Sequence, residues 1–354
     1  MELLVLDSNF VAASLFDYFE SVIWTDRYSE AGDFEVYTPM SSEILESVKP
    51  GNYVYSKHSE HMMIVERIEI SSDPEDGDKL LIAGRSLESI LDRRIVWTQT
   101  NLSGSVQNGV QKLLNDAIIN PSDPNRKIDN FIFQASTDQR IIDLTFEEDV
   151  QYTGITLYEI ITSLCKTYKI GFKIILDNDN NFIFSLYKGL DRTYDQSDRS
   201  YVIFSESFDN LSDSNYIQNY EEYKNVVLVA GEGNGVNKLT ESYGDVTGLD
   251  RRELYYEATD VSQSTVGILS TDEYKALLKS RGEEILEDYR VAESFEGQID
   301  AVGQFVYGTD FGMGDIVQVV NAYGIDAKST IIELVMSQNT DTIDFYPTFE
   351  IVEE

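Results

Sequence analysis

The two histidines of this chain, His58 and His61, are the first residues whose type and spacing could do chemistry. Imidazole nitrogens are common zinc ligands, so an HxxH pair on one face of a helix could begin a metal site. Here the pair lies between two strand-like runs, and no third nitrogen or sulfur ligand is near in sequence. The zinc-protease motif HExxH is also absent. We therefore interpret this segment as a solvated hairpin tip and predict that no metal binds there.

Cys165 is the single cysteine, and a nucleophilic thiol would need an exposed, electropositive setting. It falls on the apolar face of a predicted helix, which favours a buried and inert thiol. A histidine partner could come only from His58 or His61. One cysteine also excludes an internal disulfide and a zinc ribbon.

Two further stretches resemble ligand-binding loops but depart from them. The glycines of Gly231-Glu232-Gly233-Asn234-Gly235 follow a strand-like run, but a dinucleotide fingerprint needs its third glycine one position later, at Val236. Asp177-Asn178-Asp179-Asn180-Asn181 matches the first half of a calcium loop, but the expected glycine is Phe182 and the closing acid is Lys188. We predict turns at both places, and no cofactor, catalytic group or metal in the chain.

The composition argues against several classes of protein. The 354 residues include 63 acidic and 27 basic ones, which gives a net charge of −36. A nucleic-acid binder or a protein that docks on an anionic membrane would need a basic surface. With 42% hydrophobic and 12% aromatic residues the chain is too apolar to be a disordered acidic tail. No secretory signal or membrane-spanning run is visible in it, so we expect neither, and the composition does not predict an enzyme.

The large negative charge allows two interpretations. It could serve solubility alone, because a net charge far from zero keeps a protein dispersed. It could also repel another polyanion, because a protein that lets DNA pass without holding it needs acidic walls. Composition does not show where the acids lie, so both interpretations stay open.

Apolar patterning predicts mainly β-structure at both ends of the chain and an α+β unit between them. In the first part we expect a short helix over 41–48 and strands over 3–6, 21–24, 34–37, 52–55, 62–70 and 79–84. In the middle we expect helices over 106–118 and from a capping box at Thr156, then a hairpin of 172–176 and 182–187. In the last part we expect a helix over about 272–291 after a capping box at Ser270, and strands over 225–230, 298–307, 315–320 and 329–335. The fold class is α+β, mainly β, with domains at 1–100, 101–215 and 216–354.

Several stretches, taken together and in order, resemble the tail-hub proteins of long-tailed phages and prophages, which are related to contractile-tail hubs and secretion-system spikes. The first two stretches are Trp24 to Phe34, read as W..RY...G.F, and Gly84 to Ile95, read as GRSL..LL.RRI. The others are Asn225 to Gly233, Arg281 to Leu286 and Tyr307 to Val317, the last read as YG.DF..GD.V. They span roughly residues 20 to 335, which is nearly the whole chain.

The resemblance implies a trimeric ring that closes the distal end of the tail tube. In such hubs two β-barrel-like domains per subunit give the trimer a pseudo-sixfold face, and an α/β segment packs outside. We therefore expect two β-barrel-like domains, an α/β segment between them and one long helix in the C-terminal part. A trimer would carry three times −36, or −108, which suits a conduit through which DNA passes without specific binding.

The resemblance also marks structural residues. We expect Trp24 and Phe34 in a core, and Gly32 and Gly84 at turns or close backbone approaches. We expect Arg85, Arg93 and Arg94 to pair with carboxylates either inside the fold or across the trimer interface. The complete set is Trp24, Gly32, Phe34, Gly84, Arg85, Arg94, Gly231, Gly282, Gly314 and Asp315.

The resemblance further implies the setting. We expect synthesis in the bacterial host cytoplasm, a place at the virion tail tip, and contacts with the distal tail protein, the tape-measure protein and a receptor-binding or fibre protein. Many relatives continue into a fibre or a cell-wall-cleaving domain, whereas this sequence stops at Glu354, so we expect such activities on another polypeptide. Two alternatives stay open, a tail-associated cell-wall hydrolase and a carbohydrate-binding tail-tip module that uses some of the 22 Tyr, 17 Phe and 2 Trp.

Overall fold

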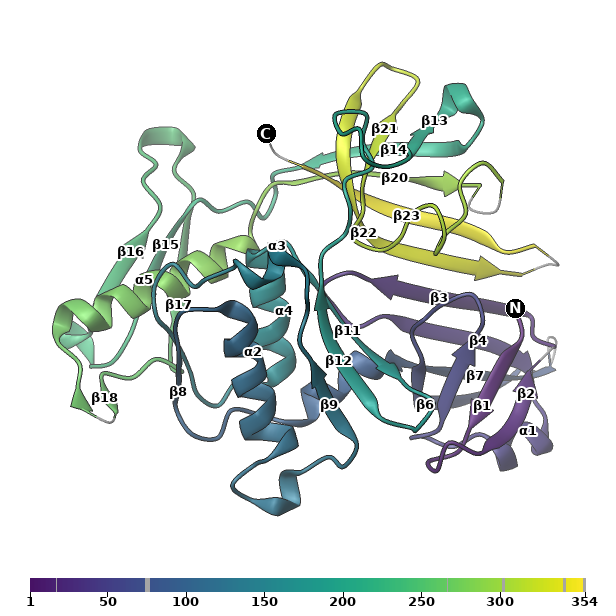
Figure 1. Cartoon of the computed structure of the whole chain (residues 1–354), viewed down its shortest axis with the longest axis horizontal. Coiled ribbons are helices and arrows are strands. Elements are labelled where there is room, and N and C mark those ends of the chain that lie inside the picture. The colour runs from purple at the N-terminus through teal and green to yellow at the C-terminus, as the bar shows by residue number, and fades with distance from the viewer. Residues whose placement is uncertain (17, 74–76, 266, 301–302, 340–341, 353–354) are drawn as a thin grey trace.

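One large open sheet organises the chain, which a computed structural model describes over residues 1–354 except 17, 74–76, 266, 301–302, 340–341 and 353–354 (Figure 1). Its 13 described strands follow the order β14-β20-β23-β22-β3-β4-β7-β6-β5-β1-β2, with β21 paired to β22 and β13 paired to β21. Their bounds are β1 (Leu3–Leu6), β2 (Ala12–Phe16), β3 (Ser21–Arg27), β4 (Asp33–Pro39), β5 (Tyr53–Ser56), β6 (Met63–Asp73), β7 (Gly77–Ser86), β13 (Ile203–Ser205), β14 (Leu211–Asn219), β20 (Ala292–Ile299), β21 (Ile316–Val320), β22 (Asp326–Gln338) and β23 (Asp344–Ile351).

The two ends of the chain meet in this sheet through β22 and β3. The first part of β22 pairs antiparallel with β21, and its last part, from Glu333 to Gln338, pairs with Arg27 to Val22 of β3. At 13 residues β22 is long enough to offer one edge to two partners in succession, while its other edge pairs with β23. Strands of the N-terminal and C-terminal parts therefore lie side by side (Figure 1).

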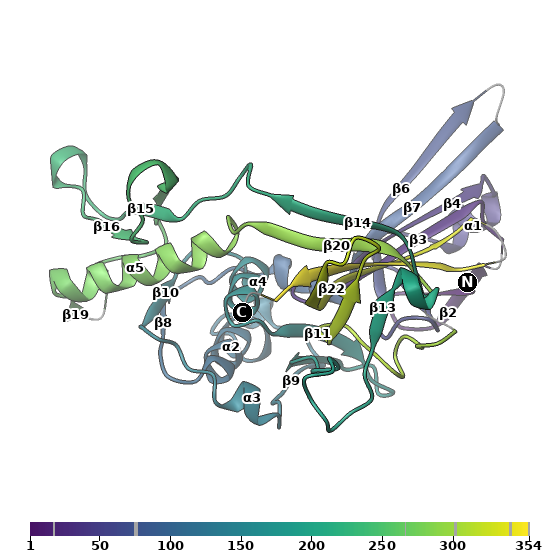
Figure 2. The same cartoon turned by 90° about the horizontal axis from the view of Figure 1, so that it is seen from above.

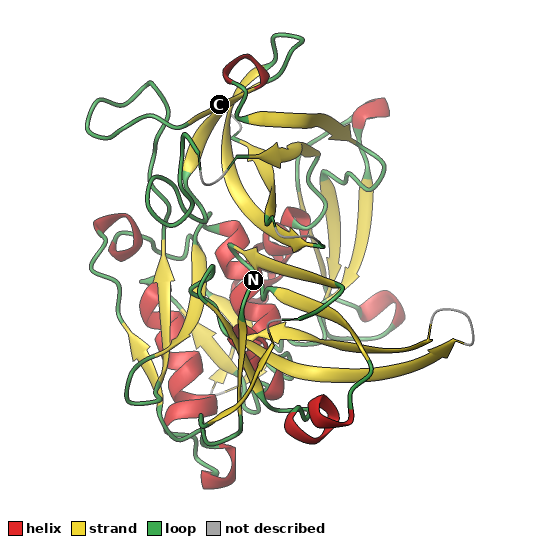
Figure 3. Ribbon diagram, turned by 90° about the vertical axis from the view of Figure 1, so that its right-hand side faces the viewer, coloured by secondary structure: helices red, strands yellow, loops and turns green. Residues whose placement is uncertain are grey.

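The prediction of two barrel-like domains is not confirmed. No sheet of the described residues closes into a barrel, and the large sheet ends in three outer strands, β2, β14 and, on the branch through β21, β13. The physical reason is the pairing of β22 with β3, which joins the strands of both terminal parts into one open sheet. The hairpin of β6 and β7 projects from the rest of the molecule (Figure 2). The mainly β composition is confirmed (Figure 3).

One apolar core serves both terminal parts. It contains fully buried aromatic rings from the N-terminal strands, such as Trp24 and Phe34, and from the second half of the chain, such as Phe204, Phe295 and Phe349. Alternation along β4, whose residues are buried at every second position, sends one face of the strand into this core. The shared core explains why the sheet continues across β22 and β3.

The middle of the chain forms a second core around two helices. Helix α2 (Val106–Leu114) begins after Ser105, and α4 (Leu157–Thr167) begins after Thr156, whose hydroxyl accepts from the Glu159 amide at 3.1 Å. The predicted hairpin is confirmed as β11 (Gly171–Leu176) and β12 (Phe182–Tyr187). The remaining strands of this part are β8 (Thr100–Leu102), β9 (Phe131–Gln134) and β10 (Val150–Tyr152).

A third, smaller core lies under α5 (Thr271–Glu287), the helix predicted over about 272–291, which ends four residues earlier. The capping box at Ser270 is confirmed, with the Glu273 amide donating to its hydroxyl and the Glu273 carboxylate accepting from its amide. The helix packs on β15 (Val226–Ala230), which lies between β16 (Thr240–Tyr243) and β17 (Glu253–Glu257). The prediction of a single long helix is not confirmed, because the described residues also form α4, of 11 residues, and α2, of 9 residues, beside the 17 residues of α5.

The remaining described elements are short. The predicted helix over 41–48 is α1 (Ser42–Ser47), and α3 (Gln139–Ile142) is a single turn. The predicted strand over 298–307 is wrong beyond Ile299, where β20 ends, and residues 301–302 lie outside the described residues. A small two-stranded sheet consists of β18 (Ser264–Thr265) and β19 (Gly267–Ile268). The 3-10 and π segments are η1 (Leu87–Arg93), η2 (Asn115–Ile119), η3 (Pro124–Arg126), η4 (Glu206–Phe208), η5 (Gly235–Asn237) and η6 (Gly248–Asp250). In the part described, none of the helices is long and apolar enough to cross a membrane. The domain boundaries at residues 100 and 215 stay predictions.

Candidate functional site

The thiol of Cys165 is buried in α4, as predicted. Burial raises the pKa of this thiol, which keeps it protonated and unreactive at neutral pH. Among the described residues no group of three or more His, Cys, Asp or Glu side chains converges as a metal site would. The polar side chains that do converge in this structure are buried, and they join elements to one another.

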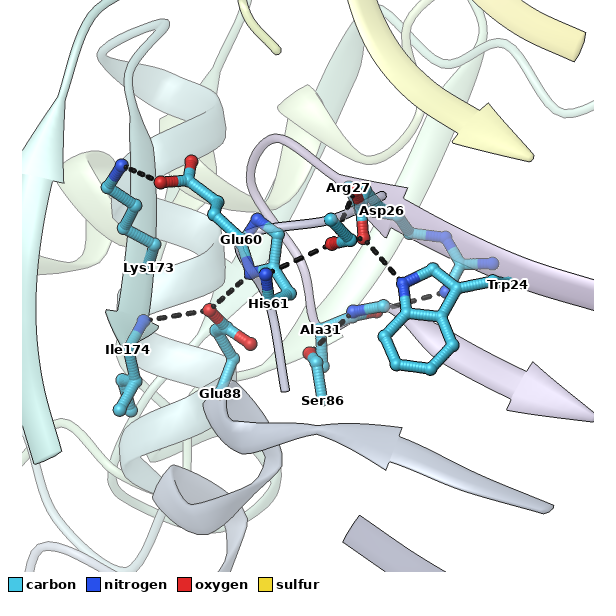
Figure 4. A network of polar contacts seen from close by, with 12 residues as sticks. Trp24, Asp26, Arg27, Ala31, Glu60, His61, Ser86, Glu88, Lys173 and Ile174 are labelled. Carbon is cyan, nitrogen blue, oxygen red and sulfur yellow. Dashed lines mark hydrogen bonds and ion pairs between the residues drawn. The ribbon is translucent and has the colours of Figure 1, made fainter. Parts of the chain in front are cut away.

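His61 is one of these, and its predicted place on a solvated hairpin tip is wrong. Its side chain is buried, with 3% of the residue exposed. Two buried carboxylates stabilise its positive charge there. Its Nδ1 atom lies 3.0 Å from Oε1 of Glu88 on η1, and the carboxylate of Asp26 on β3 lies nearby (Figure 4). The glutamate oxygen also accepts from the Ile174 amide of β11 at 2.7 Å. The pair therefore joins the large sheet to the middle part of the chain.

Asp26 extends the same network toward the core. Its carboxylate accepts from the indole nitrogen of Trp24 at 3.1 Å and from the hydroxyl of Ser59 at 2.8 Å. The Tyr307 hydroxyl donates to its other oxygen at 3.4 Å. Figure 4 shows Trp24 and Asp26 on one side of the network and Lys173 and Ile174 of β11 on the other, where Lys173 also pairs with Glu60 at 2.6 Å. One buried aspartate thus connects side chains from three separate stretches of the chain.

The charges of this network depend on one another. Burial alone would lower the pKa of His61, but the carboxylates of Glu88 and Asp26 raise it to about 9. Burial alone would raise the pKa of Glu88, but protonated His61 and hydrogen bonds to the carboxylate lower it. The pKa of Asp26 is raised, chiefly by burial. At neutral pH the histidine and the glutamate therefore form a buried ion pair.

The first group of family-motif residues comes together on β3, β4 and β7. Trp24 and Phe34 are cross-strand partners, with ring centroids 5.9 Å apart, and both are fully buried. Gly84 pairs with Phe34 from the other side and faces an irregularity in β6, where a Cβ would lie 1.8 Å from the Ile64 carbonyl oxygen. At Gly32 a Cβ would lie 2.1 Å from the Thr25 carbonyl oxygen. Both glycines therefore permit close backbone approach.

The arginines of the same motif have different partners. Arg85 donates from Nε and Nη2 to the two oxygens of Glu66, at 2.8 and 3.0 Å, and its Nη1 lies 3.4 Å from Asp92. These are ion pairs inside the fold. Arg94 instead donates to the carbonyl oxygen of Arg126 at 2.8 Å, and it has no carboxylate partner among the described residues.

A second pair of motif residues, Gly231 and Gly282, lets α5 lie close to β15. A Cβ on Gly282 would be 2.9 Å from the Val227 side chain, and one on Gly231 would be 2.3 Å from the Tyr274 hydroxyl oxygen. That hydroxyl accepts from the Glu232 amide at 2.8 Å. The two glycines therefore serve the packing of the third core.

The last two motif residues, Gly314 and Asp315, lie at a junction around Tyr28. The backbone of Gly314 has a φ of 82°, and a Cβ there would be 2.2 Å from the Tyr28 ring. A Cβ on Gly171 of β11 would be 2.4 Å from the same ring. Asp315 accepts from Nε of Arg192 at 2.6 Å. Tyr28 thus packs against glycines from the middle and C-terminal parts, a role that sequence analysis missed although the ring stands inside the first motif.

Sequence analysis also missed a second buried charge network, on α5. Arg281 is 8% exposed, and its Nη1 and Nη2 atoms lie 2.6 Å from Glu284 and 3.3 Å from Asp260. The hydroxyl of Tyr152 on β10 donates to the same glutamate at 2.6 Å. This network connects α5 to the middle part of the chain. An arginine three residues before a glutamate on a predicted helix was the available signal.

Comparisons with known proteins agree with this architecture. A protein-family model described as Siphovirus ReqiPepy6 Gp37-like protein matches residues 2–349. Among solved structures, the 43 kDa tail protein of prophage MuSo2 from Shewanella oneidensis is similar, with a TM-score of 0.58 and 12% identity over 99% of this chain and 98% of that one. The tail protein from Neisseria meningitidis MC58 has a TM-score of 0.56 and 14% identity, over 98% and 95% of the two chains.

Prophage tail protein gp18 from Listeria monocytogenes EGD-e is similar as well, with a TM-score of 0.52 and 11% identity over 99% and 94% of the two chains. At these identities the likeness is one of fold. No curated protein sequence matches this chain.

Proposed function

The chain is a member of the Siphovirus ReqiPepy6 Gp37-like family, and from that premise we propose that it is a structural subunit of a phage tail tip. Three copies form a hub ring at the distal end of the tail tube. The observation that carries this proposal is the fold it shares with three phage or prophage tail proteins along at least 94% of each chain.

The outer strands of the large sheet support assembly into a ring. β2, β14 and the short β13 are its outer strands, and each has one edge without a partner strand among the described residues. Next to the β2 edge, Val11, Leu15 and Tyr18 are 60%, 57% and 73% exposed. An exposed strand edge with apolar side chains is a site at which another chain can add. Pairing of unlike edges around a threefold axis closes a ring.

The charge supports the role of a conduit. The trimer carries three times −36, and walls of that sign let DNA pass without binding it. In this arrangement residues 1–100 and 216–354 of each copy take equivalent places around the ring, and residues 101–215 pack outside. The neighbours are the distal tail protein, the tape-measure protein and a receptor-binding or fibre protein.

We assign no catalysis to this subunit. The buried charged side chains of His61, Glu88, Arg281 and Glu284 form ion pairs that join elements of the fold. Buried ion pairs that join elements of a fold perturb pKa values without taking part in catalysis. A zymogram on purified cell walls tests this assignment, with a lysozyme as the positive control. The proposal expects no cleared band at the position of this protein, and clearing would favour a cell-wall hydrolase.

The place of the protein in the virion is testable by gold-labelled antibodies and electron microscopy of intact particles. The proposal expects gold at the distal end of the tail in particles whose tip is accessible. Gold along the tail shaft or on the head would contradict it. Particles of an unrelated phage serve as the control for nonspecific labelling.

A further inference from the structure

Three arginines without an ion pair gather next to an exposed tryptophan, and we name Arg93, Arg94, Arg126 and Trp97 the arginine patch. The guanidinium of Arg126 stacks on the indole, with 4.3 Å from its Cζ atom to the ring centroid. Its Nη2 donates to the Ile95 carbonyl oxygen at 2.6 Å. Arg94 donates from Nε to the Arg126 carbonyl oxygen at 2.8 Å and from Nη1 to the Arg93 carbonyl oxygen at 2.9 Å.

The fold itself holds the guanidinium groups of Arg94 and Arg126 in place, but through backbone carbonyls and an aromatic ring rather than through carboxylates. Among the described residues, Arg27, Arg85 and Arg192 each pair with at least one carboxylate. The three arginines of the patch have none, in a chain with 63 acidic residues. Arg199 and Arg252 also lack an ion pair among the described residues, and Arg252 likewise donates to a backbone carbonyl oxygen and stacks on Tyr220. What sets the patch apart is that its cations lie together beside an exposed tryptophan.

Arg126 is the most enclosed cation of the patch, with 8% of the residue exposed. Burial and the neighbouring positive charge of Arg94 lower the pKa of Arg126. The charge of Asp123 acts to raise this pKa, but no carboxylate of the described residues lies within ion-pair distance of the Arg126 guanidinium group. A buried cation without an anion is costly, and an arriving carboxylate would relieve that cost.

The surroundings of the patch have the composition of a protein interface. Trp97 is 55% exposed and Ile95 is 38% exposed, although both are large apolar residues. Tryptophan and arginine are the residue types most enriched at the energetically important centres of interfaces. The patch thus combines an apolar contact area with fixed cationic donors.

We propose that the arginine patch binds a carboxylate-bearing segment of a neighbouring copy of this chain, so that it is one contact of the ring. This inference rests on the proposed trimer and names a contact within it. Copies that each carry −36 repel one another, so their association needs a local attraction between opposite charges. A neighbouring copy supplies carboxylates in excess.

A nucleic acid is the other polyanion that three arginines could bind. The patch is small, and the acids Asp92, Asp123 and Asp129 stand close to it in sequence. A phosphate backbone is long enough to meet those carboxylates and the rest of a chain of net charge −36, whereas a single carboxylate side chain would contact the patch alone. The observations therefore favour a protein carboxylate, and DNA binding is one outcome of the test.

The test combines charge reversal with crosslinking. Arg93→Glu is the first variant, because it reverses an exposed charge next to Arg94 and keeps the backbone carbonyl oxygen to which Arg94 donates. Arg199→Glu is the matched control, since Arg199 is also an exposed arginine without an ion pair among the described residues. The trimer midpoint concentration is measured for both variants and the wild type. We expect Arg93→Glu to raise it at least ~10-fold and Arg199→Glu to leave it unchanged.

A photoreactive residue at Trp97 identifies what lies against the patch. We expect crosslinks between two copies of this chain, at an acidic segment, in the wild-type background. A wild-type trimer that Arg93→Glu does not weaken would overturn this inference and leave the proposed function standing. Arginine-dependent retention of duplex DNA, or crosslinks to DNA alone, would also overturn it. A wild type that never forms trimers would contradict the proposed function itself.

Discussion

Nδ1 of His61 lies 3.0 Å from Oε1 of Glu88, and both side chains are buried where η1 of the N-terminal part meets β11 of the middle part. The pair holds two parts of the chain together by charge. Buried ion pairs of this kind depend strongly on both partners, since removing one leaves the other without compensation. The stability of the protein should therefore respond to pH and to substitutions here in ways that exposed pairs do not reproduce.

The first prediction concerns alkaline pH. The folded pKa of His61, about 9, is above its ordinary value of 6.5, so its stabilising contribution is complete below pH 6.5 and is lost as pH rises through about 9. The shift corresponds to a change on the order of 3 kcal/mol in the free energy of unfolding. Urea unfolding across this range measures it.

His61→Gln should remove most of this pH dependence, because glutamine does not titrate. His58→Gln is the control, since burial and the nearby Lys57 lower the pKa of His58 instead. If His61→Gln loses stability between pH 6.5 and 9 as steeply as the wild type, the assignment of the loss to this histidine fails.

The second prediction concerns the carboxylate. Glu88→Ala should destabilise the protein by about 3–5 kcal/mol, because protonated His61 loses its nearest counter-ion and the Ile174 amide loses its acceptor. Glu66→Ala, which removes the exposed partner of Arg85, should cost less than about 1 kcal/mol. Chemical denaturation at neutral pH compares the two, and equal effects would contradict the account of the buried pair.

The third prediction concerns close backbone approach. Gly84→Ala would place a Cβ 1.8 Å from the Ile64 carbonyl oxygen, so the paired strands β6 and β7 must shift. We expect a loss of about 3 kcal/mol or more in the free energy of unfolding. Gly312→Ala is the matched control, because a Cβ there meets nothing within 4 Å, and it should change stability by less than about 0.5 kcal/mol.

The fourth prediction concerns DNA. The purified protein should not retard duplex DNA in an electrophoretic mobility assay at low salt, where electrostatic binding is strongest. A basic DNA-binding protein at the same concentration is the positive control. Retardation of the DNA that disappears as salt is added would show that a cationic face of the protein binds DNA. That result would contradict a conduit that lets DNA pass without binding it.

Local signals explain what the sequence could predict. A hydroxyl and a glutamate three residues later predict a helix start wherever they precede an apolar run, and Ser270 and Thr156 both begin helices. The alternation along the strand over 62–70 and the apolar runs around 177–181 likewise predict strands from neighbouring residues. The buried thiol of Cys165 follows from helical periodicity alone.

The missed features depend on residues far apart in the sequence. The pairing of β22 with β3 joins residues 333–338 to residues 22–27, and the residue pattern of neither strand indicates which strand will pair with it. His61 stands in a polar segment that reads as a turn, and its burial depends on Asp26 and Glu88, which lie 35 and 27 positions away. Tyr28 is likewise enclosed by glycines from two other parts of the chain.

Multi-angle light scattering of the purified protein tests the proposed hub ring most directly. The mass is measured at low and moderate salt and over a wide range of protein concentration. The account predicts a species of three times 40.2 kDa, favoured at moderate salt, where repulsion between the acidic copies is screened. A mass of 40.2 kDa under every condition would contradict the hub ring.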